Sequence, residues 1–125
     1  MSKVVFYRDK NNRSQIEDLL LELKEKARSS KSDRIRLESI WFCINMLREK
    51  GLNIREPYAK KIIGEPDLYE LRPRSDRVFF FSQTRDTLVL LYSFVKKSQK
   101  TPDKEIAQAI REKKEYIERM MKNEK

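Results

Sequence analysis

Between residues 58 and 95 the apolar residues change from helical spacing to the period of two that is typical of strands. No other feature of the sequence constrains the fold as strongly. Short apolar or alternating segments follow one another at residues 58–63, 68–72, 77–83 and 88–95. They are separated by three connections rich in turn-forming residues, Gly64-Glu-Pro-Asp67, Pro73-Arg-Ser-Asp76 and Thr84-Arg-Asp-Thr87. Because such short connections join antiparallel neighbours, we predict an antiparallel meander of at least three strands.

Two helical segments precede these strands. The first covers about residues 15–28 and begins with a capping box, in which Ser14 and Glu17 each satisfy a free backbone N–H group. Its apolar residues recur at helical spacing, at Ile16, Leu19, Leu20 and Leu23. The second covers about residues 34–50 and follows a short polar connection. We therefore expect the two helices to form an antiparallel hairpin.

The second helix carries its own start and stop signals. Ser32 or Asp33 is the predicted N-cap, and Gly51 is the predicted end because glycine tolerates a left-handed backbone. The face directed at the core is predicted to hold Leu37, Ile40, Trp41, Ile44 and Leu47. Cys43 lies in the same helix and is predicted to be a small buried apolar residue.

Each end of the chain adds one element. Residues 3–8 are β-branched and aromatic, which predicts a first strand at a sheet edge or beside the meander. Thr101 and Pro102 fit the N-cap and first position of a last helix over about 102–121. Its apolar face is predicted to hold Ile106, Ala109, Ile110, Ile117 and Met121. This order of elements predicts an α+β fold in a single domain over residues 1–125, with the helical hairpin packed on one face of an antiparallel sheet.

The charge and the absence of histidine limit the function. The chain has 29 Lys and Arg residues against 20 Asp and Glu residues, a net charge of +9, which favours a phosphate-bearing partner. With no histidine and one cysteine it can form no Ser-His-Asp triad, zinc-finger ligand set or internal disulfide. We therefore expect no metal or cofactor and a reducing cytoplasmic location. No apolar run is long enough for a membrane span, so we expect no membrane partner.

Strand pairing predicts where the basic residues gather. If the hairpin turns are centred at Arg74-Ser75 and Arg85-Asp86, then Arg72 lies opposite Arg77. Alternation collects Glu70, Arg72, Arg77, Phe79, Tyr92 and Phe94 on one face. The other face, toward the helical hairpin, then holds Val78, Phe80, Val89, Leu91 and Val95. Opposed arginines repel by up to about 1 kcal/mol, so either an anion binds between them or Glu70 joins them in a salt network.

Several strings in order resemble the HigB-type toxins of the RelE/ParE superfamily. They are Leu68-Tyr-Glu-Leu-Arg-Pro73, Arg77-Val-Phe-Phe-Phe81 and Leu88-Val-Leu-Leu-Tyr-Ser-Phe-Val-Lys-Lys97, which runs on to Thr101-Pro102. The resemblance implies a toxin of a type II toxin–antitoxin pair, with two N-terminal helices against the sheet and a basic concave surface. It also implies an endoribonuclease (mRNA interferase) that cleaves mRNA on the ribosome. The implied partner is a helix-turn-helix antitoxin, through which alone the toxin would contact operator DNA.

The resemblance also implies roles for individual residues. The predicted catalytic residues are Arg72, Arg77, Tyr92 and Lys96, and the predicted RNA-binding residues are Lys60, Lys61, Phe94, Lys97 and Lys100. The arginines suit charge stabilisation on a phosphorane, and the rings suit stacking on a splayed base. Many similar toxins carry His-Gly where this chain has Tyr92-Ser93, which leaves the phenol or a lysine for proton transfer.

Other interpretations of the same residues stay open at this point. Tyr92 is also typical of a half-buried strand aromatic, and Glu70 is either a base or a fixed counter-ion. A ParE-like toxin would inhibit a topoisomerase by protein contact, without nuclease chemistry. A non-catalytic RNA-binding protein or co-repressor would use the same basic face without turnover.

Overall fold

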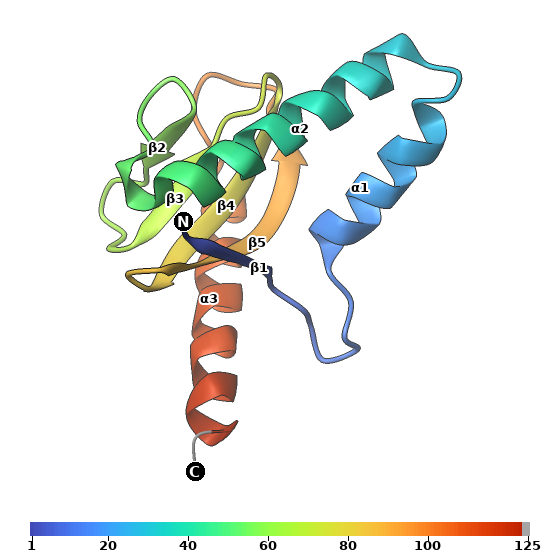
Figure 1. The fold of residues 1–125 in the computed structure, drawn as a ribbon. Helices are drawn as coiled ribbons and strands as arrows, with labels where there is room; N and C mark the ends of the chain where they lie inside the picture. Colours follow the sequence, from blue (N-terminus) through green and yellow to red (C-terminus); the bar gives the residue numbers. More distant parts are fainter. Residues whose placement is uncertain (124–125) are drawn as a thin grey trace.

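A computed structural model describes residues 1–123 (Figure 1). The elements in order are β1 (Lys3–Phe6), α1 (Gln15–Lys26), α2 (Lys31–Lys50), a 3-10 turn (Gly51–Asn53), β2 (Ala59–Lys61), β3 (Leu68–Leu71), β4 (Asp76–Thr84), β5 (Thr87–Val95) and α3 (Asp103–Asn123). The predicted α+β class and element order are confirmed. Among the helices of the described chain, none combines the length and apolarity that a bilayer crossing requires.

The strands form one five-stranded sheet in the order β1-β5-β4-β3-β2. The meander from β2 to β5 is antiparallel, as predicted. β1 lies at the edge beside β5 and runs parallel to it, with Lys3 paired to Thr87 and Phe6 to Leu90. The sheet is therefore mixed: its meander is antiparallel as predicted, and the direction of the first strand, which the sequence did not decide, is parallel to β5. Parallel neighbours need a long connection, and the chain between β1 and β5 supplies it.

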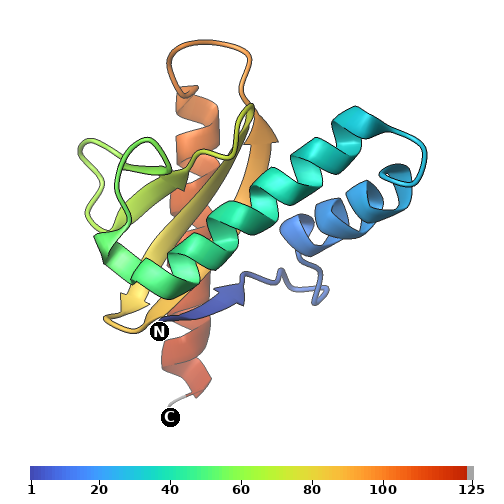
Figure 2. The same cartoon turned by 45° about the horizontal axis from the view of Figure 1, so that its top comes forward.

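The sheet is the middle layer of three. Figures 1 and 2 show α2 lying across one face and α3 crossing behind the other, with α1 returning beside α2 as a hairpin that extends past the sheet. We call these the α2 face and the α3 face. Each is lined by its own cluster of buried residues. The predicted helical hairpin is present, and the second covering helix makes the α3 face as important as the α2 face.

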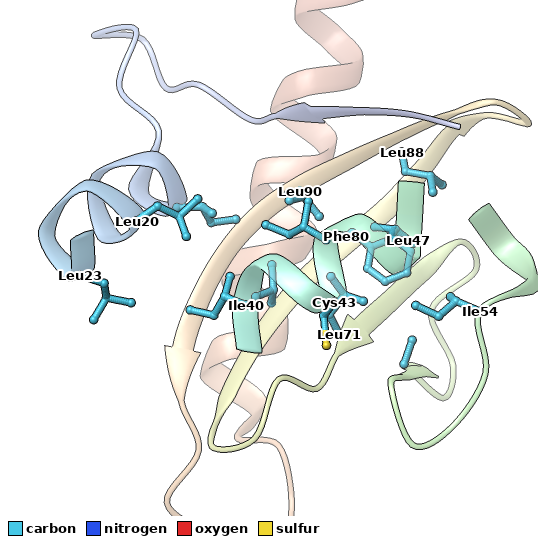
Figure 3. Packing of buried hydrophobic residues seen from close by; sticks show 14 residues of the cluster. Leu20, Leu23, Ile40, Cys43, Leu47, Ile54, Leu71, Phe80, Leu88 and Leu90 are labelled. Atoms are coloured by element: carbon cyan, nitrogen blue, oxygen red, sulfur yellow. The ribbon is translucent and has the colours of Figure 1, made fainter. Parts of the chain in front are cut away.

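The α2 face holds a wholly apolar cluster (Figure 3). From α2 the buried residues are Ile40, Cys43, Ile44 and Leu47, at the spacing of one helical stripe. The prediction that Cys43 is buried is confirmed: it is 3% exposed, and burial raises the pKa of its thiol to about 11. Trp41 is 38% exposed, so its predicted core position was wrong. It lies on the flank of the stripe, where the sheet no longer covers it.

The two helix starts differ in how well they were predicted. Ser14 caps α1 as predicted, because its side chain accepts a 3.1 Å hydrogen bond from the N–H of Glu17. For α2 the N-cap is Ser30, whose side chain accepts from the N–H of Asp33 at 3.3 Å. The prediction of Ser32 or Asp33 was wrong, because several serines in this connection could each supply a cap and only one matches the backbone geometry.

The end of α2 was predicted correctly, and the start of α3 differs from its prediction by one residue. Gly51 ends α2 as predicted, with φ of 56°, in the range that favours glycine. A Cβ at this position would also come within 2.5 Å of the side-chain oxygen of Ser2. Thr101 was predicted to be the N-cap of α3 and Pro102 its first residue. α3 instead begins at Asp103, so Pro102 is the residue that precedes the helix. The Thr101 side chain instead bonds to the sheet, as described below.

The predicted apolar face of α3 is correct only near its start. Ala109 is fully buried, and Ile106 and Ile110 pack partly buried beside it. The two residues predicted nearer the end, Ile117 and Met121, are 38% and 59% exposed. In Figure 1 the last part of α3 extends beyond the sheet, so its side chains are less completely covered than those near its start.

The strand register matches the prediction where the basic residues lie. Arg77 pairs with Phe94 across β4 and β5, and Leu71 pairs with Val78 across β3 and β4. Arg72, one residue beyond β3, therefore lies opposite Arg77. The turn residues set this register, because the loop length decides which strand positions meet.

A β-bulge in β5 changes which side chains face which helix. Phe79 pairs with Tyr92 but Phe80 pairs with Leu90, which leaves Leu91 as an extra residue. The residues of β5 before the bulge therefore point to the sheet face opposite to the one that strict alternation predicts. Two residues predicted to face the helical hairpin, Val89 and Leu91, lie on the α3 face instead. Val95, at the end of the strand, is 46% exposed. It pairs with Asp76 on the α2 face, as predicted, but it is not covered there.

Candidate functional site

Glu70, in β3, is the centre of the site. It is 1% exposed, and its Oε1 accepts a 3.3 Å hydrogen bond from Nε of Arg72 and lies 3.7 Å from Nε of Arg77. Its Oε2 accepts a 2.7 Å hydrogen bond from the hydroxyl of Thr101. Both oxygens thus have partners, which a buried carboxylate requires. The salt network left open in the sequence is present, and the two arginines converge from neighbouring strands.

Arg77 is held more firmly than Arg72. Its side chain is 14% exposed, and Nη1 donates to the carbonyl oxygens of Arg74 at 2.6 Å and Asp76 at 2.8 Å. Within residues 1–123 its Nε has no hydrogen-bond partner that meets the usual geometry. Burial lowers the pKa of this guanidinium, which Glu70 opposes. Arg77 is therefore a fixed, incompletely neutralised charge beside the turn.

An ion pair that the sequence did not suggest anchors that turn. Asp76, the first residue of β4, is 1% exposed and accepts two hydrogen bonds from Arg36 of α2, at 3.1 and 2.8 Å. This bidentate geometry is the strong form of an arginine–carboxylate contact. It fixes the residue next to Arg77 from the far layer of the molecule. The pair joins residues 40 positions apart, so no local pattern could have found it.

The basic side chains surround two adjoining hollows. The first, which we call the basic cleft, has a volume of about 310 Å³ and includes Glu70, Arg72, Lys60, Lys61, Lys96, Lys100 and Thr101 in its lining. The second has about 490 Å³ and includes Arg74, Arg77, Lys96 and Lys97. Lys96 lines both, so the two hollows are neighbours. Eight cationic residues in these linings face two carboxylates, Glu70 and Asp103, which makes the surface strongly positive.

Lys96 occupies the middle of this surface. It directly follows β5, and its backbone N–H donates a 2.8 Å hydrogen bond to the carbonyl of Ser75 in the β3–β4 turn. Its ammonium group is partly removed from water, which lowers its pKa, and the neighbouring charges of Arg77, Arg72 and Lys60 lower that pKa further. Lys96 is thus the cleft lysine whose environment most favours the neutral amine.

The two aromatic residues predicted for the site lie differently. Tyr92 is 5% exposed beneath α3, and its hydroxyl donates to the backbone oxygen of Glu105 at 2.7 Å. Burial and the contact with the Glu105 carboxylate, 3.0 Å away, raise the pKa of this phenol. The structure therefore does not bring Tyr92 into the cleft. Phe94 is half-buried opposite Arg77, with its ring stacked at 5.6 Å on Phe79.

The site therefore contains most of the predicted residues and some that were missed. Brought together are the two arginines, Lys96 and the four predicted RNA-binding lysines, Lys60, Lys61, Lys97 and Lys100. Missed were Thr101, Arg74 and the Asp76–Arg36 pair. Over the part of the chain that the structure covers, no three His, Cys, Asp or Glu residues gather as a metal site.

Comparison with known proteins places the chain in a family. The model of the family described as Phage derived protein Gp49-like (DUF891) matches residues 29–114. That range contains α2, the whole meander and every residue of the basic cleft. No curated protein matches the chain. The chain belongs to the Gp49-like family, a RelE-like family of toxins from toxin–antitoxin systems.

Proposed function

We propose that this protein is a HigB-like endoribonuclease toxin that cleaves mRNA on the translating ribosome and so stops translation. The observation that carries the proposal is the convergence of Arg72 and Arg77 on Glu70 in an open, strongly basic cleft beside Lys96. Guanidinium groups match phosphate oxygens in geometry and charge, and the lysines around them suit a polyanionic strand.

The reaction that suits these residues is attack by a ribose 2′-hydroxyl on the adjacent phosphorus. The bond from phosphorus to the 5′-oxygen breaks, which leaves a 2′,3′-cyclic phosphate and a 5′-hydroxyl. Negative charge on the phosphorane oxygens is the main demand on the protein. Arg72 is 26% exposed and lines the cleft, so it contacts the phosphate directly. Arg77 supplies a fixed positive charge behind it.

The proton transfers fall to lysines rather than to Tyr92. We assign Lys96 as the acceptor of the 2′-hydroxyl proton, because its lowered pKa leaves more of it as the free amine near neutral pH. We assign Lys60, which pairs with Glu70 across β2 and β3 and lines the cleft, as the ammonium donor for the leaving 5′-oxygen. Glu70 is too buried to reach the substrate, and we assign it the positioning of the two arginines.

The partners follow from the same proposal. A toxin of this family has an antitoxin partner. We propose a helix-turn-helix antitoxin that covers part of the basic cleft and alone contacts operator DNA. The substrate is mRNA in the ribosome, and the location is the cytoplasm, where both are found. Phe94, Lys61, Lys97 and Lys100 are proposed to hold the RNA on either side of the cleaved bond.

The deciding experiment compares Arg72→Ala and Arg77→Ala with Arg28→Ala, which removes a 79% exposed side chain far from the cleft. Removing one such charge-stabilising group should slow cleavage by about 10²–10³-fold. The readout is primer extension on messages translated in vitro, together with growth after induction. We expect translation-dependent cuts from the wild type and from Arg28→Ala only.

Other results would point to other functions. Full cleavage by both cleft variants would defeat the assignment of the site. Intact messages with DNA-damage signalling would support a ParE-like topoisomerase inhibitor, and RNA binding without cleavage would support a co-repressor. Lys96→Arg retains the charge but not an accessible free amine. Loss of cleavage in that variant supports proton transfer, and retained cleavage reassigns Lys96 to phosphate binding.

A further inference from the structure

We infer that a third hollow, between α2 and the β3–β4 turn, binds a nucleobase of the RNA strand whose phosphate lies at Arg72. This hollow has a volume of about 400 Å³, and Glu38, Ser39, Phe42, Tyr58, Arg72 and Arg74 contribute to its lining. We call it the aromatic hollow. The inference rests on the proposed function, since it names a subsite for the same RNA.

Two exposed rings form one wall of the aromatic hollow. Phe42 of α2 is 53% exposed and Tyr58, just before β2, is 38% exposed. Their centroids are 5.9 Å apart and their planes meet at 53°. The rings contact each other directly, so a base cannot enter between them and must stack on their open side. Single-stranded RNA is commonly bound through bases stacked on such rings.

Arg72 connects the aromatic hollow to the basic cleft. Its side chain belongs to the lining of both. Its backbone N–H donates a 2.8 Å hydrogen bond to the carbonyl of Tyr58, which joins the backbones of the two residues. Lys60 and Lys61 follow Tyr58 in β2 and line the cleft. A strand with a phosphate at Arg72 therefore has a base position on one side and further phosphate positions on the other.

The polar groups of the hollow can bind the edge of a stacked base. Glu38 and Ser39 lie on the α2 wall, and a carboxylate accepts hydrogen bonds from the N–H groups on a base edge. Each of the four RNA bases presents at least one such N–H group, and stacking also tolerates any base. The hollow is therefore assigned to a nucleobase without a preference for one of them.

Charge decides between RNA and a protein as the occupant. Arg72 and Arg74 border the rings, and Arg72 also lines the lysine-rich cleft. A polyanionic strand matches these positive charges together with the rings. An apolar segment of a protein partner would match the rings alone.

The test uses a short 2′-O-methyl RNA that carries 2-aminopurine, because it lacks the 2′-hydroxyl nucleophile and stays intact. Stacking on the rings should quench the fluorescence when the wild type binds. A base stack of about 1–3 kcal/mol corresponds to about a 5- to 150-fold loss of affinity in Phe42→Ala. Phe42→Trp should bind at least as tightly as the wild type. Trp41→Leu is the matched control, because Trp41 is a neighbouring, 38% exposed aromatic outside the lining.

Each other outcome overturns the inference in a distinguishable way. If the wild type does not bind the RNA at all, the proposed function fails together with the inference. If the wild type binds and Phe42→Ala binds equally well without a change in quenching, the hollow is not a base site and the ribonuclease proposal stands. If Phe42→Ala weakens only the complex with the antitoxin, the hollow is a protein contact. Circular dichroism spectra verify that each variant is folded.

Discussion

The two faces of the sheet differ in the polar groups that they bury. The centre of the α2 face is apolar, with Ile44, Leu47 and Phe80 each at most 1% exposed, and its ion pair, Asp76–Arg36, is fully matched in charge and hydrogen bonds. The α3 face buries aromatic rings as well, but it also encloses the Glu70 carboxylate and the Tyr92 hydroxyl. The comparison indicates that the α2 face mainly stabilises the fold, whereas the α3 face also positions the charged groups of the cleft.

Two carboxylates, one buried in β3 and one partly buried in α3 itself, show what burial of a charge costs with and without a full set of hydrogen-bond partners. Glu70 has two arginines and a hydroxyl for its two oxygens. Glu112 has a 3.3 Å hydrogen bond from Gln108 at one oxygen, while the other has no partner within residues 1–123. Burial raises the pKa of Glu112 to about 7, and the nearby Glu115 carboxylate adds to the rise. Glu70 therefore positions the arginines of the site, whereas the charged form of Glu112 lowers the stability of the fold.

The largest expected effect is the loss of stability when the core of the α2 face is disrupted. Phe80→Ala removes a fully buried ring and should lower the free energy of unfolding by about 3–5 kcal/mol, through lost burial and the cavity left behind. Urea denaturation followed by circular dichroism measures it. Phe42→Ala, which truncates a ring that is 53% exposed, is the control and should cost far less. Equal losses in the two variants would refute the view that the buried centre of the α2 face stabilises the fold.

A smaller effect sharpens the contrast between the two carboxylates. The raised pKa means that folded Glu112 holds its proton more tightly than the unfolded chain, whose glutamates titrate near 4.5. Stability should therefore fall as the pH rises from about 4.5 to about 7. Glu112→Gln removes that cost, and at pH 8 it should stabilise the protein by roughly 1–2 kcal/mol after allowance for solvent screening.

Chemical denaturation of Glu112→Gln and the wild type at pH 4.5 and pH 8 measures this difference. Glu118, on the exposed side of the same helix, provides the control as Glu118→Gln. A gain that is the same at both pH values would contradict the explanation, because it would not depend on the charge of Glu112.

The smallest effect concerns Tyr92. Tyr92→Phe removes the hydrogen bond to Glu105 and should cost about 0.5–1.5 kcal/mol of stability. Cleavage should stay within a few-fold of the wild type, because the hydroxyl ties α3 to the sheet and does not reach the cleft. Thermal unfolding and the primer-extension assay measure the two quantities. A hundredfold loss of cleavage at unchanged stability would make Tyr92 catalytic after all.

How far the sequence could predict the site depends on the range of each contact. The pairing of Arg77 with Phe94 was predictable, because two turns with recognisable residues set the register of neighbouring strands. The bulge at Leu91 was not, because it depends on how β5 packs between two layers. The burial of Tyr92 could not be predicted for the same reason. An alternating pattern indicates which face of the sheet a residue lies on, but it does not indicate which helix covers that face.

The sequence by itself determined the elements, their order, the antiparallel meander and the grouping of the basic residues near one end of the sheet. Apolar spacing, capping residues and turns act between near neighbours, so they can be interpreted from the chain alone. Only the tertiary structure decided that β1 runs parallel to β5 and that α3 covers Tyr92. The same holds for the bond from Thr101 to Glu70 and for the bond from Arg36 to Asp76. These contacts join distant parts of the chain, and their geometry exists only after the layers have packed.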